Sequence, residues 1–199
     1  MTDRIDSLSP RAILRDGVEA HAEAVAACLP ALEGSFSMAV ELCEARLNAG
    51  GKIVLFGNGG SAADAQHIAS QLTVRFTFDR RAIPALALTT DTSALTACGN
   101  DYGFDRIFAR QVEALVRAND AVIGISTSGR SPNVLAALRR AREIGAATIG
   151  FTGSAAGEMP SVCDALLRAP ANATARIQEI HIMLGHLLCE ALERRLGYV

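Results

Sequence analysis

Five short apolar runs, spread over residues 52–170, constrain the fold of this chain most strongly. The runs are KIVLFG (52–57), ALALTT (85–90), AVIGIS (121–126), ATIGFTG (147–153) and a weaker ALLRAP (165–170). Runs of this length and composition are typical of short strands that are buried on both faces. Helical patterning lies between several of them, at residues 61–75, 104–117 and 132–144. We therefore predict an α/β fold in which a doubly wound parallel sheet is flanked by helices on both faces.

Further helices are expected before and after this region. One covers residues 10–28, with Pro30 marking its break, and a second ends at Gly50 and Gly51. The second helix has an apolar face made of Phe36, Val40, Cys43 and Leu47, and a final helix is predicted over residues 174–195. These apolar faces exceed what one small sheet needs to cover. We expect residues 10–50 to make oligomer contacts within a single domain over 1–199, whose sheet and site occupy 52–199.

Charge and hydropathy argue against several classes of partner. The net charge is −2, and no basic stripe or aromatic-rich basic patch indicates direct binding to nucleic acid. No apolar run approaches the ~20 residues that are needed to span a bilayer. The N-terminus also lacks the hydrophobic core of a signal peptide. We therefore expect a cytoplasmic protein without membrane contacts.

The first apolar run ends in a segment rich in glycine, FGNGGSAAD, whose residues Asn58, Gly59 and Gly60 we call the glycine loop. Glycine permits positive φ angles and close backbone approach, and backbone N–H groups at a helix start can bind an anion. Ser61 is the expected N-cap of the next helix, with Asp64 in the position of a capping-box acid. The loop lacks the lysine of a P-loop and does not match G-x-G-x-x-G, so an ordinary strand-to-helix turn is an equal alternative.

The third apolar run is followed directly by hydroxyl groups, in the segment STSGRS (126–131) that we call the serine loop. Ser131 can cap the next helix, with Pro132 at its first position. Hydroxyls and free N–H groups suit a phosphate monoester when no lysine or metal is at hand. Because ligands bind beyond the carboxyl ends of the strands in an open parallel sheet, both loops are expected at one site.

Four stretches together give the chain a specific resemblance to a known family. They are GNGGSAADAQHIA (57–69), LTTDTSALTACGNDYGFDRIF (88–108), GISTSGRSPNV (124–134) and ARIQEIHIMLGHLLCE (175–190). In this order they resemble the sugar isomerase (SIS) domain and, more narrowly, the bacterial phosphoheptose isomerases. The resemblance implies a SIS-type fold and a homotetramer with active sites between subunits. It also implies conversion of sedoheptulose 7-phosphate to D-glycero-D-manno-heptose 7-phosphate, for lipopolysaccharide or other heptose biosynthesis.

The resemblance also assigns roles to individual positions. Residue 71 and His186 take the positions of the catalytic base and of its acid partner. Contacts to the sugar phosphate fall on Asn58, Gly59, Gly60, Gln71, Asn100, Asp101, Ser126, Thr127, Ser128, Ser131 and Gln178. One zinc ion per subunit would be held by His67, Gln71, Gln178 and His186. We expect Asn100 and Asp101 to lie in a sugar-binding loop.

The spacing of the implied zinc ligands agrees with these roles. His67 and Gln71 are four residues apart and share a helix face. Gln178 and His186 are eight residues apart, which places them about 80° from each other around a helix. Gln178 and His186 can therefore converge on one site, and the resemblance implies that all four side chains do so.

Position 71 departs from the family pattern, because an aldose–ketose isomerase needs a base and the family has glutamate there. An amide has no useful basicity near neutral pH, and zinc prefers anionic oxygen to a neutral amide. Three explanations stay open. Glutamine was placed there deliberately to inactivate an enzyme, or the chain is a natural non-catalytic relative, or the base comes from elsewhere. The rival function is a non-catalytic SIS protein that binds phosphosugars or a replication initiator.

Overall fold

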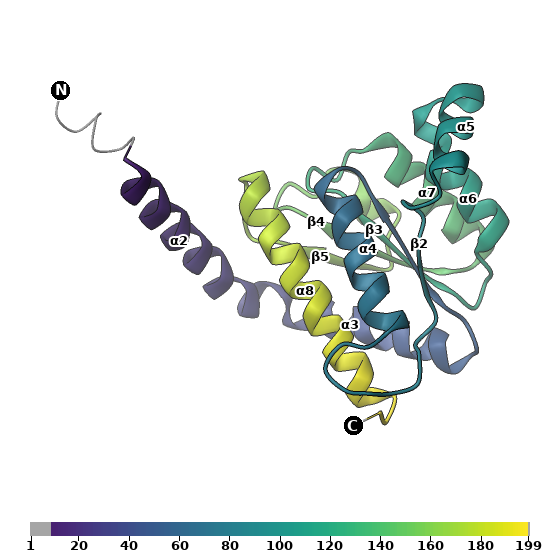
Figure 1. Ribbon diagram of the computed structural model, residues 1–199, viewed down its shortest axis with the longest axis horizontal. Helices are drawn as coiled ribbons and strands as arrows, with labels where there is room; N and C mark the ends of the chain where they lie inside the picture. Colours follow the sequence, from purple (N-terminus) through teal and green to yellow (C-terminus); the bar gives the residue numbers. More distant parts are fainter. Residues whose placement is uncertain (1–8, 199) are drawn as a thin grey trace.

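The computed structural model describes residues 9–198 of the chain, and a parallel sheet of five strands lies at its centre (Figure 1). The sheet order is β2-β1-β3-β4-β5, and every neighbouring pair is parallel. The strands are β1 (Ile53–Gly57), β2 (Ala85–Ala87), β3 (Ala121–Ile125), β4 (Ala147–Thr152) and β5 (Ala165–Arg168). Each strand falls within one of the five apolar runs, so the predicted strands and their parallel arrangement are confirmed.

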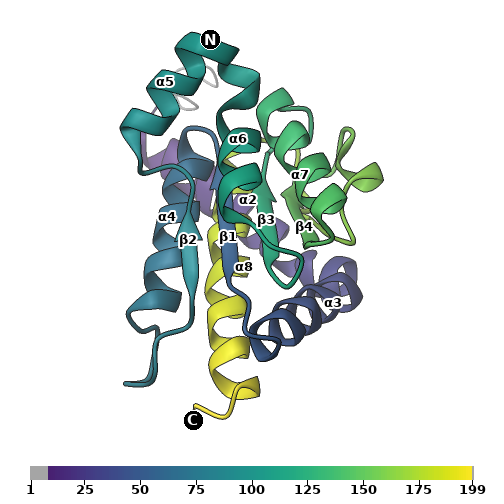
Figure 2. The ribbon, with the colours of Figure 1, turned by 90° about the vertical axis from the view of Figure 1, so that its right-hand side faces the viewer.

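Helices cover both faces of the sheet, as predicted (Figure 2). Along β1, Ile53 and Leu55 pack into one apolar core, while Val54 and Phe56 pack into the other. The first core includes α3 (Cys28–Asn48), α4 (Gly60–Thr73) and α8 (Thr174–Arg195). The second includes α5 (Thr92–Tyr102), α6 (Ile107–Leu115) and α7 (Pro132–Ile144). The described residues also form two 3₁₀ turns, η1 (Phe104–Arg106) and η2 (Met159–Ser161).

The boundaries of the first two helices differ from the prediction. Helix α2 (Pro10–Ala26) ends before Ala27, and α3 begins at Cys28, so Pro30 lies in the first turn of α3 and does not mark the break. Proline is tolerated in a first turn because the N–H that it lacks has no intrahelical partner there. At the other end, α3 stops at Asn48 and Gly50 has φ +77°, as the glycine pair predicted.

Helix α5 was not predicted from the sequence. Asp91 caps it, since its side chain accepts a hydrogen bond from Ala94 N at 2.9 Å. Only Cys98 is buried among its residues, which explains why no apolar periodicity was visible. Asn100 and Asp101 therefore lie in the last turn of a helix and not in the expected loop.

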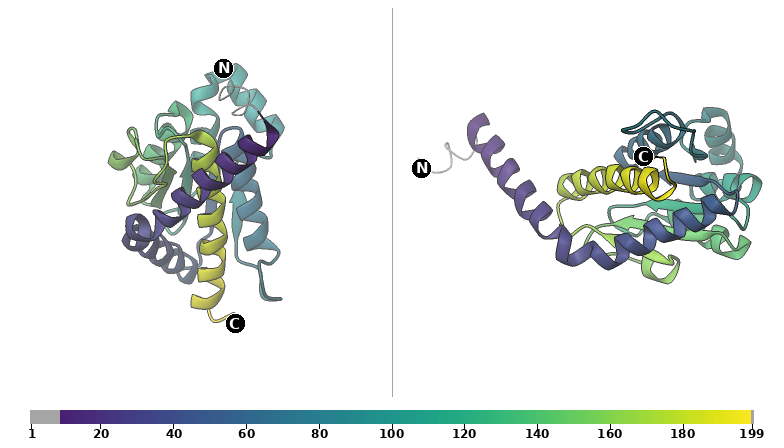
Figure 3. Two further views of the ribbon diagram at one scale, coloured as in Figure 1. Left: turned by 90° about the vertical axis from the view of Figure 1, so that its left-hand side faces the viewer. Right: turned by 90° about the horizontal axis from the view of Figure 1, so that it is seen from below.

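Helix α2 projects from the body of the molecule, at 53° to α3 (Figure 3). Its apolar side chains Ile13, Leu14 and Val18 are exposed by 60%, 68% and 58%. Helix α3, in contrast, buries Leu32, Val40 and other residues in the core. Only part of the region predicted to make oligomer contacts therefore has apolar side chains exposed for them. Within residues 9–198, no single helix has the length and apolar content to cross a membrane; only the bent pair of α2 and α3 together meets that test.

Candidate active site

The glycine loop follows β1 and begins α4 at the carboxyl edge of the sheet. Gly59 occupies the N-cap position with φ +56°, a conformation that favours glycine. The amide of Asn58 exchanges two hydrogen bonds, of 2.9 and 2.8 Å, with the amide of Asn133 in α7. The glycine loop is thereby tied to the helix that follows the serine loop. Asn133 is 1% exposed and was not singled out from the sequence, because no local pattern marks a partner 75 residues away.

The predicted capping roles of Ser61 and Asp64 are wrong. The N-cap of helix α4 lies two residues earlier, at Gly59, and makes no side-chain capping bond. Ser61 is buried within the first turn, and Asp64 Oδ2 is buried without a hydrogen-bond partner. Burial raises the pKa of Asp64, while the nearby His67 lowers it. The positive φ of Gly59 moved the helix start, which a side-chain capping pattern could not indicate.

The serine loop follows β3 and is closed by its own hydroxyl groups. Ser126 Oγ and Ser131 Oγ lie 2.9 Å apart, and Ser128 Oγ accepts a hydrogen bond from the backbone N of Arg130 at 3.2 Å. Ser131 occupies the N-cap position of α7, with Pro132 first in the helix, as predicted. Its side chain makes no capping bond and turns to Ser126 instead. Gly129 has φ +65°, and a Cβ there would lie 2.0 Å from the carbonyl oxygen of Ala156.

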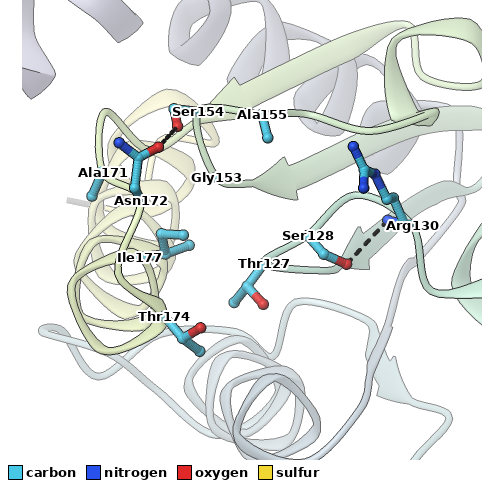
Figure 4. Close-up of a pocket in the computed structure, with 10 residues that line it drawn as sticks. All are labelled: Thr127, Ser128, Arg130, Gly153, Ser154, Ala155, Ala171, Asn172, Thr174 and Ile177. Atoms are coloured by element: carbon cyan, nitrogen blue, oxygen red, sulfur yellow. Dashed lines mark hydrogen bonds between the residues drawn. The ribbon is translucent and has the colours of Figure 1, made fainter.

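A cavity of about 230 Å³ opens beside the serine loop (Figure 4). Thr127 and Ser128 line one side, and segments that follow β4 and β5 line the other. From those segments come Ser154 and Asn172, which share a hydrogen bond, and Thr174 at the start of α8. The sequence reasoning missed these three residues. Their positions just after two strand ends are the signal that could have found them.

Helices α4 and α8 lie side by side and run in the same direction (Figure 1). Near the start of both, a Cβ on Gly60 would come within 2.5 Å of Gln178 Nε2. Further along, a Cβ on Gly185 would come within 2.5 Å of Ile68 Cδ1. The two helices approach this closely because each presents a glycine to the other. The histidines of the two helices meet directly beside the second contact.

His67, Gln71 and His186 form a group that we call the histidine cluster. The two Nε2 atoms of His67 and His186 are 2.9 Å apart, and Gln71 Nε2 lies 3.2 Å from His67 Nε2. Burial lowers the pKa of His186, and the neighbouring His67 lowers it further. Two ring nitrogens at hydrogen-bond distance require one protonated and one unprotonated atom. Because the amide nitrogen of Gln71 can only donate, His67 Nε2 is the acceptor for both neighbours, and His186 Nε2 is the donor to it.

Gln178 does not join the cluster, contrary to the predicted convergence of all four side chains. Its amide lies against Gly60 at the beginning of α4. Eight residues correspond to a rise of about 12 Å along a helix. The angle of about 80° around the helix takes no account of this rise, and Gln178 lies against Gly60 of the glycine loop while His186 faces His67.

The donors in the cluster fit a zinc ion in part. Two imidazole nitrogens bound to one tetrahedral zinc stand roughly 3.3 Å apart, given Zn–N bonds of about 2.0–2.1 Å. The observed 2.9 Å requires only a small opening. Gln71 adds a neutral amide where an anionic oxygen would bind more tightly. Within residues 9–198, no three His, Cys, Asp or Glu side chains gather as a metal site, so any zinc here relies on two imidazoles and an amide.

Asn100 and Asp101 lie apart from these groups in the single chain. Both are exposed, and their side chains bond to each other, with Asn100 Nδ2 donating to Asp101 Oδ1 at 2.8 Å. The structure therefore brings the glycine loop and the serine loop together through Asn58 and Asn133, and it places the histidine cluster further along α4 and α8. It leaves these two residues on the solvent-facing end of α5.

Comparison with known proteins gives a consistent result. The family model of the SIS domain matches residues 18–153. The phosphoheptose isomerase of Paramagnetospirillum magneticum is 54% identical over 173 residues, which covers 87% of this chain and 90% of that protein. The phosphoheptose isomerase of Aliarcobacter butzleri is 51% identical over 179 residues, covering 90% of this chain and 95% of that protein.

Solved structures show the same relationship. The phosphoheptose isomerase of Neisseria gonorrhoeae superimposes with a TM-score of 0.89 at 42% identity, covering 94% of this chain and all of that one. The phosphoheptose isomerase of Francisella tularensis gives a TM-score of 0.87 at 34% identity with the same coverage. The likeness therefore extends over nearly the whole of the fold described above.

Proposed function

The chain belongs to the phosphoheptose isomerase family of SIS-domain enzymes, and from this premise we propose that its two loops and histidine cluster form one isomerase site. The substrate is sedoheptulose 7-phosphate and the product D-glycero-D-manno-heptose 7-phosphate. One observation carries the proposal: a loop of hydroxyls follows β3 at the carboxyl edge of the sheet, and a facing pair of imidazoles joins α8 to α4, the helix that starts at that edge. The first suits a phosphate and the second suits proton transfer.

The phosphate end of the site consists of the serine loop and the glycine loop. Thr127 and Ser128 present hydroxyls to the cavity, and Ser126 and Ser131 hold the loop closed from behind. Free backbone N–H groups at the start of α4 add positive potential. These groups bind and orient the phosphate, and they leave C1 and C2 of the sugar free to extend toward α4 and α8.

The histidine cluster serves the reacting carbons. Isomerisation of the ketose removes a proton from C1 and adds one to C2, while a hydroxyl proton passes from the oxygen on C1 to the oxygen on C2. His186, whose pKa is lowered by burial, accepts the proton from the oxygen on C1 and donates a proton to the oxygen on C2. Gln71 takes the position of the base for the carbon-bound proton and lacks the basicity for it. We therefore propose that the chain is an isomerase whose turnover is impaired by Gln71.

Zinc would be held by His67 and His186, with Gln71 as a weak third ligand and Gln178 too far along α8 to join without rearrangement. Bound zinc would polarise the oxygens on C1 and C2. The donor chemistry supports one ion per subunit of modest affinity. Competition with a chromophoric chelator measures that affinity, and Gln71→Glu should tighten it because a carboxylate replaces an amide.

Assembly as a homotetramer in the cytoplasm is proposed on two grounds, the family and the exposed apolar face of α2. Asn100 and Asp101 face solvent in the single chain. If the active sites lie between subunits, these two residues could contact the sugar bound there. The product would enter lipopolysaccharide or other heptose biosynthesis. Light scattering tests the assembly: four chains per particle are expected, and a stable monomer at micromolar concentration contradicts the proposal.

An isomerase assay with sedoheptulose 7-phosphate tests the function. The chain should convert the substrate slowly, and His186→Ala should remove this activity while phosphosugar affinity in calorimetry stays within about threefold. The alternative, suggested by Gln71, is a binding protein that recognises phosphosugars or a replication initiator. Binding without turnover, together with capture of the initiator in a pull-down, would favour that alternative.

A further inference from the structure

A buried ion pair lies at one end of the histidine cluster and has no part in the mechanism above. Arg80, in the segment 74–84 that joins α4 to β2, donates from Nε to Glu193 Oε1 in α8 at 2.7 Å. The side chains are only 1% and 0% exposed. Burial of two charges is unfavourable unless hydrogen bonds compensate for the lost water. The bonds around this pair therefore indicate what it holds in place.

The pair connects three segments that surround the cluster. Arg80 donates from Nη2 to the carbonyl of Gln71, and from Nη1 to the next carbonyl along α4, at 2.9 Å each. Glu193 accepts hydrogen bonds from the backbone N of Phe76 and of Thr77, at 3.1 Å each. The last turn of α4, the segment after it and helix α8 are thus fixed relative to one another.

Phe76 extends this arrangement to His186. The two rings stack with their centroids 5.6 Å apart and their planes at 26°. The ring of His67 approaches His186 by its edge, at 5.1 Å and 67°. Glu193 lies seven residues after His186, so both project from the same face of α8, two turns apart. His186 is therefore held between Phe76 and His67, and Phe76 is held by Glu193.

We propose that Arg80, Glu193 and Phe76 are positioning residues that fix the His186 ring for proton transfer. The proposal rests on the function given above, because it takes His186 as the group that serves the sugar oxygens. Phe76 restricts rotation of the His186 side chain, and the ion pair restricts Phe76. Displacement of a reacting group by about 1 Å can lower a rate about 10²-fold. The effect should therefore fall on kcat, since the phosphate end lies elsewhere.

The first test is a matched pair of phenylalanine variants in one segment. Phe76→Leu removes the stacked ring but keeps the backbone N–H that Glu193 accepts, and it should lower kcat about 10–100-fold with KM nearly unchanged. Phe76→Tyr keeps the ring and should retain most of kcat. Phe78→Leu alters a side chain that is 41% exposed and should have no effect. Thermal unfolding confirms that each variant is folded.

The second test follows the His186 ring by NMR and needs no turnover. Stacking on Phe76 shifts the His186 ring protons by ring current, and this shift should vanish in Phe76→Leu, change in Glu193→Gln and persist in Phe78→Leu. An unchanged kcat in Phe76→Leu, or His186 signals that do not move, overturns the proposal. If the chain itself fails to isomerise the sugar, the proposed function falls, while the NMR comparison still decides whether Phe76 and Glu193 position His186.

Discussion

The two ends of the candidate site are built in different ways. At the phosphate end, the glycine loop and the serine loop are each one continuous segment directly after a strand. The histidine cluster joins two helices, and its histidines are 119 residues apart in the chain. The first depends on local backbone geometry and the second on packing between α4 and α8. Affinity for the phosphate and turnover of the sugar should therefore respond to different substitutions.

The largest expected effect is on turnover at the histidine cluster. Gln71→Glu would supply a base near C1 and C2 and an anionic ligand beside His67, so kcat should rise ~10²–10⁴-fold. Phosphosugar affinity should change far less, because the phosphate end is untouched. Assays of the two proteins side by side measure the gain, and His186→Ala in the variant should abolish most of it. If kcat of the Gln71→Glu variant does not exceed that of the parent, the absence of a base at position 71 is not what limits turnover.

The buried histidine of α8, His181, should make the stability of the protein depend on pH. His181 is fully buried against the sheet, and burial lowers its pKa to about 4. Between pH 6.5 and pH 4 the unfolded state binds a proton that the native state does not bind. The free energy of unfolding therefore decreases as the pH is lowered through this range. The parent should lose about 3 kcal/mol more of its unfolding free energy over this range than His181→Leu. Urea titrations at both pH values measure this difference, and equal losses would contradict it.

That substitution should be tolerated at neutral pH. His181 Nε2 bonds to the carbonyl of Thr152 at 3.2 Å, but the same carbonyl also accepts from Ala169 N at 2.8 Å. His181 Nδ1 has no hydrogen-bond partner. Leucine therefore leaves no new buried polar group unpaired.

A smaller effect is expected at the phosphate end. Ser126→Ala together with Ser128→Ala removes one hydroxyl that closes the serine loop and another that faces the cavity. Hydrogen bonds to a charged group contribute about 1.5–3 kcal/mol, so phosphosugar affinity should fall roughly 10–100-fold. Turnover at saturating substrate should stay near that of the parent. Calorimetry measures the affinity, and an unchanged affinity would contradict the proposal that this loop binds the phosphate.

The smallest effect concerns the contact between the two helices. In Gly185→Ala the new Cβ would meet Ile68 Cδ1, and overpacking of about 1–3 kcal/mol is partly offset by a gain in helix propensity of about 1 kcal/mol. A net loss of about 1 kcal/mol in stability is expected, with inorganic phosphate affinity unchanged. Adding Ile68→Val removes Cδ1 but keeps Cγ1, which the new Cβ would meet at 2.7 Å, so it should restore stability only in part. A variant that weakens phosphate binding would show that the two ends of the site are coupled.

The sequence predicted most of the fold, since short apolar runs specify buried strands without reference to distant residues. It also located the glycine loop and the serine loop at the ends of two strands, because each loop directly follows an apolar run. Interactions between distant segments were beyond it: the pairing of Asn58 with Asn133, the contact of Gln178 with Gly60, and the clamp of Arg80 on Glu193. Helix α5 has no apolar periodicity in its sequence, because only one of its residues is buried. The start of α4 was misplaced because a glycine conformation, and not a side chain, determines it.

Helix α8 follows all five strands along the chain, yet it packs on the same sheet face as α3 and α4. During synthesis the strands and the phosphate end therefore leave the ribosome before the helix that carries His186. Apolar side chains such as Ile123 and Ile149 stay incompletely covered in that interval. At ~5–20 residues per second, the delay is on the order of seconds. A nascent chain can thus contain both loops while it still exposes an apolar surface to chaperones or to premature contacts with other chains.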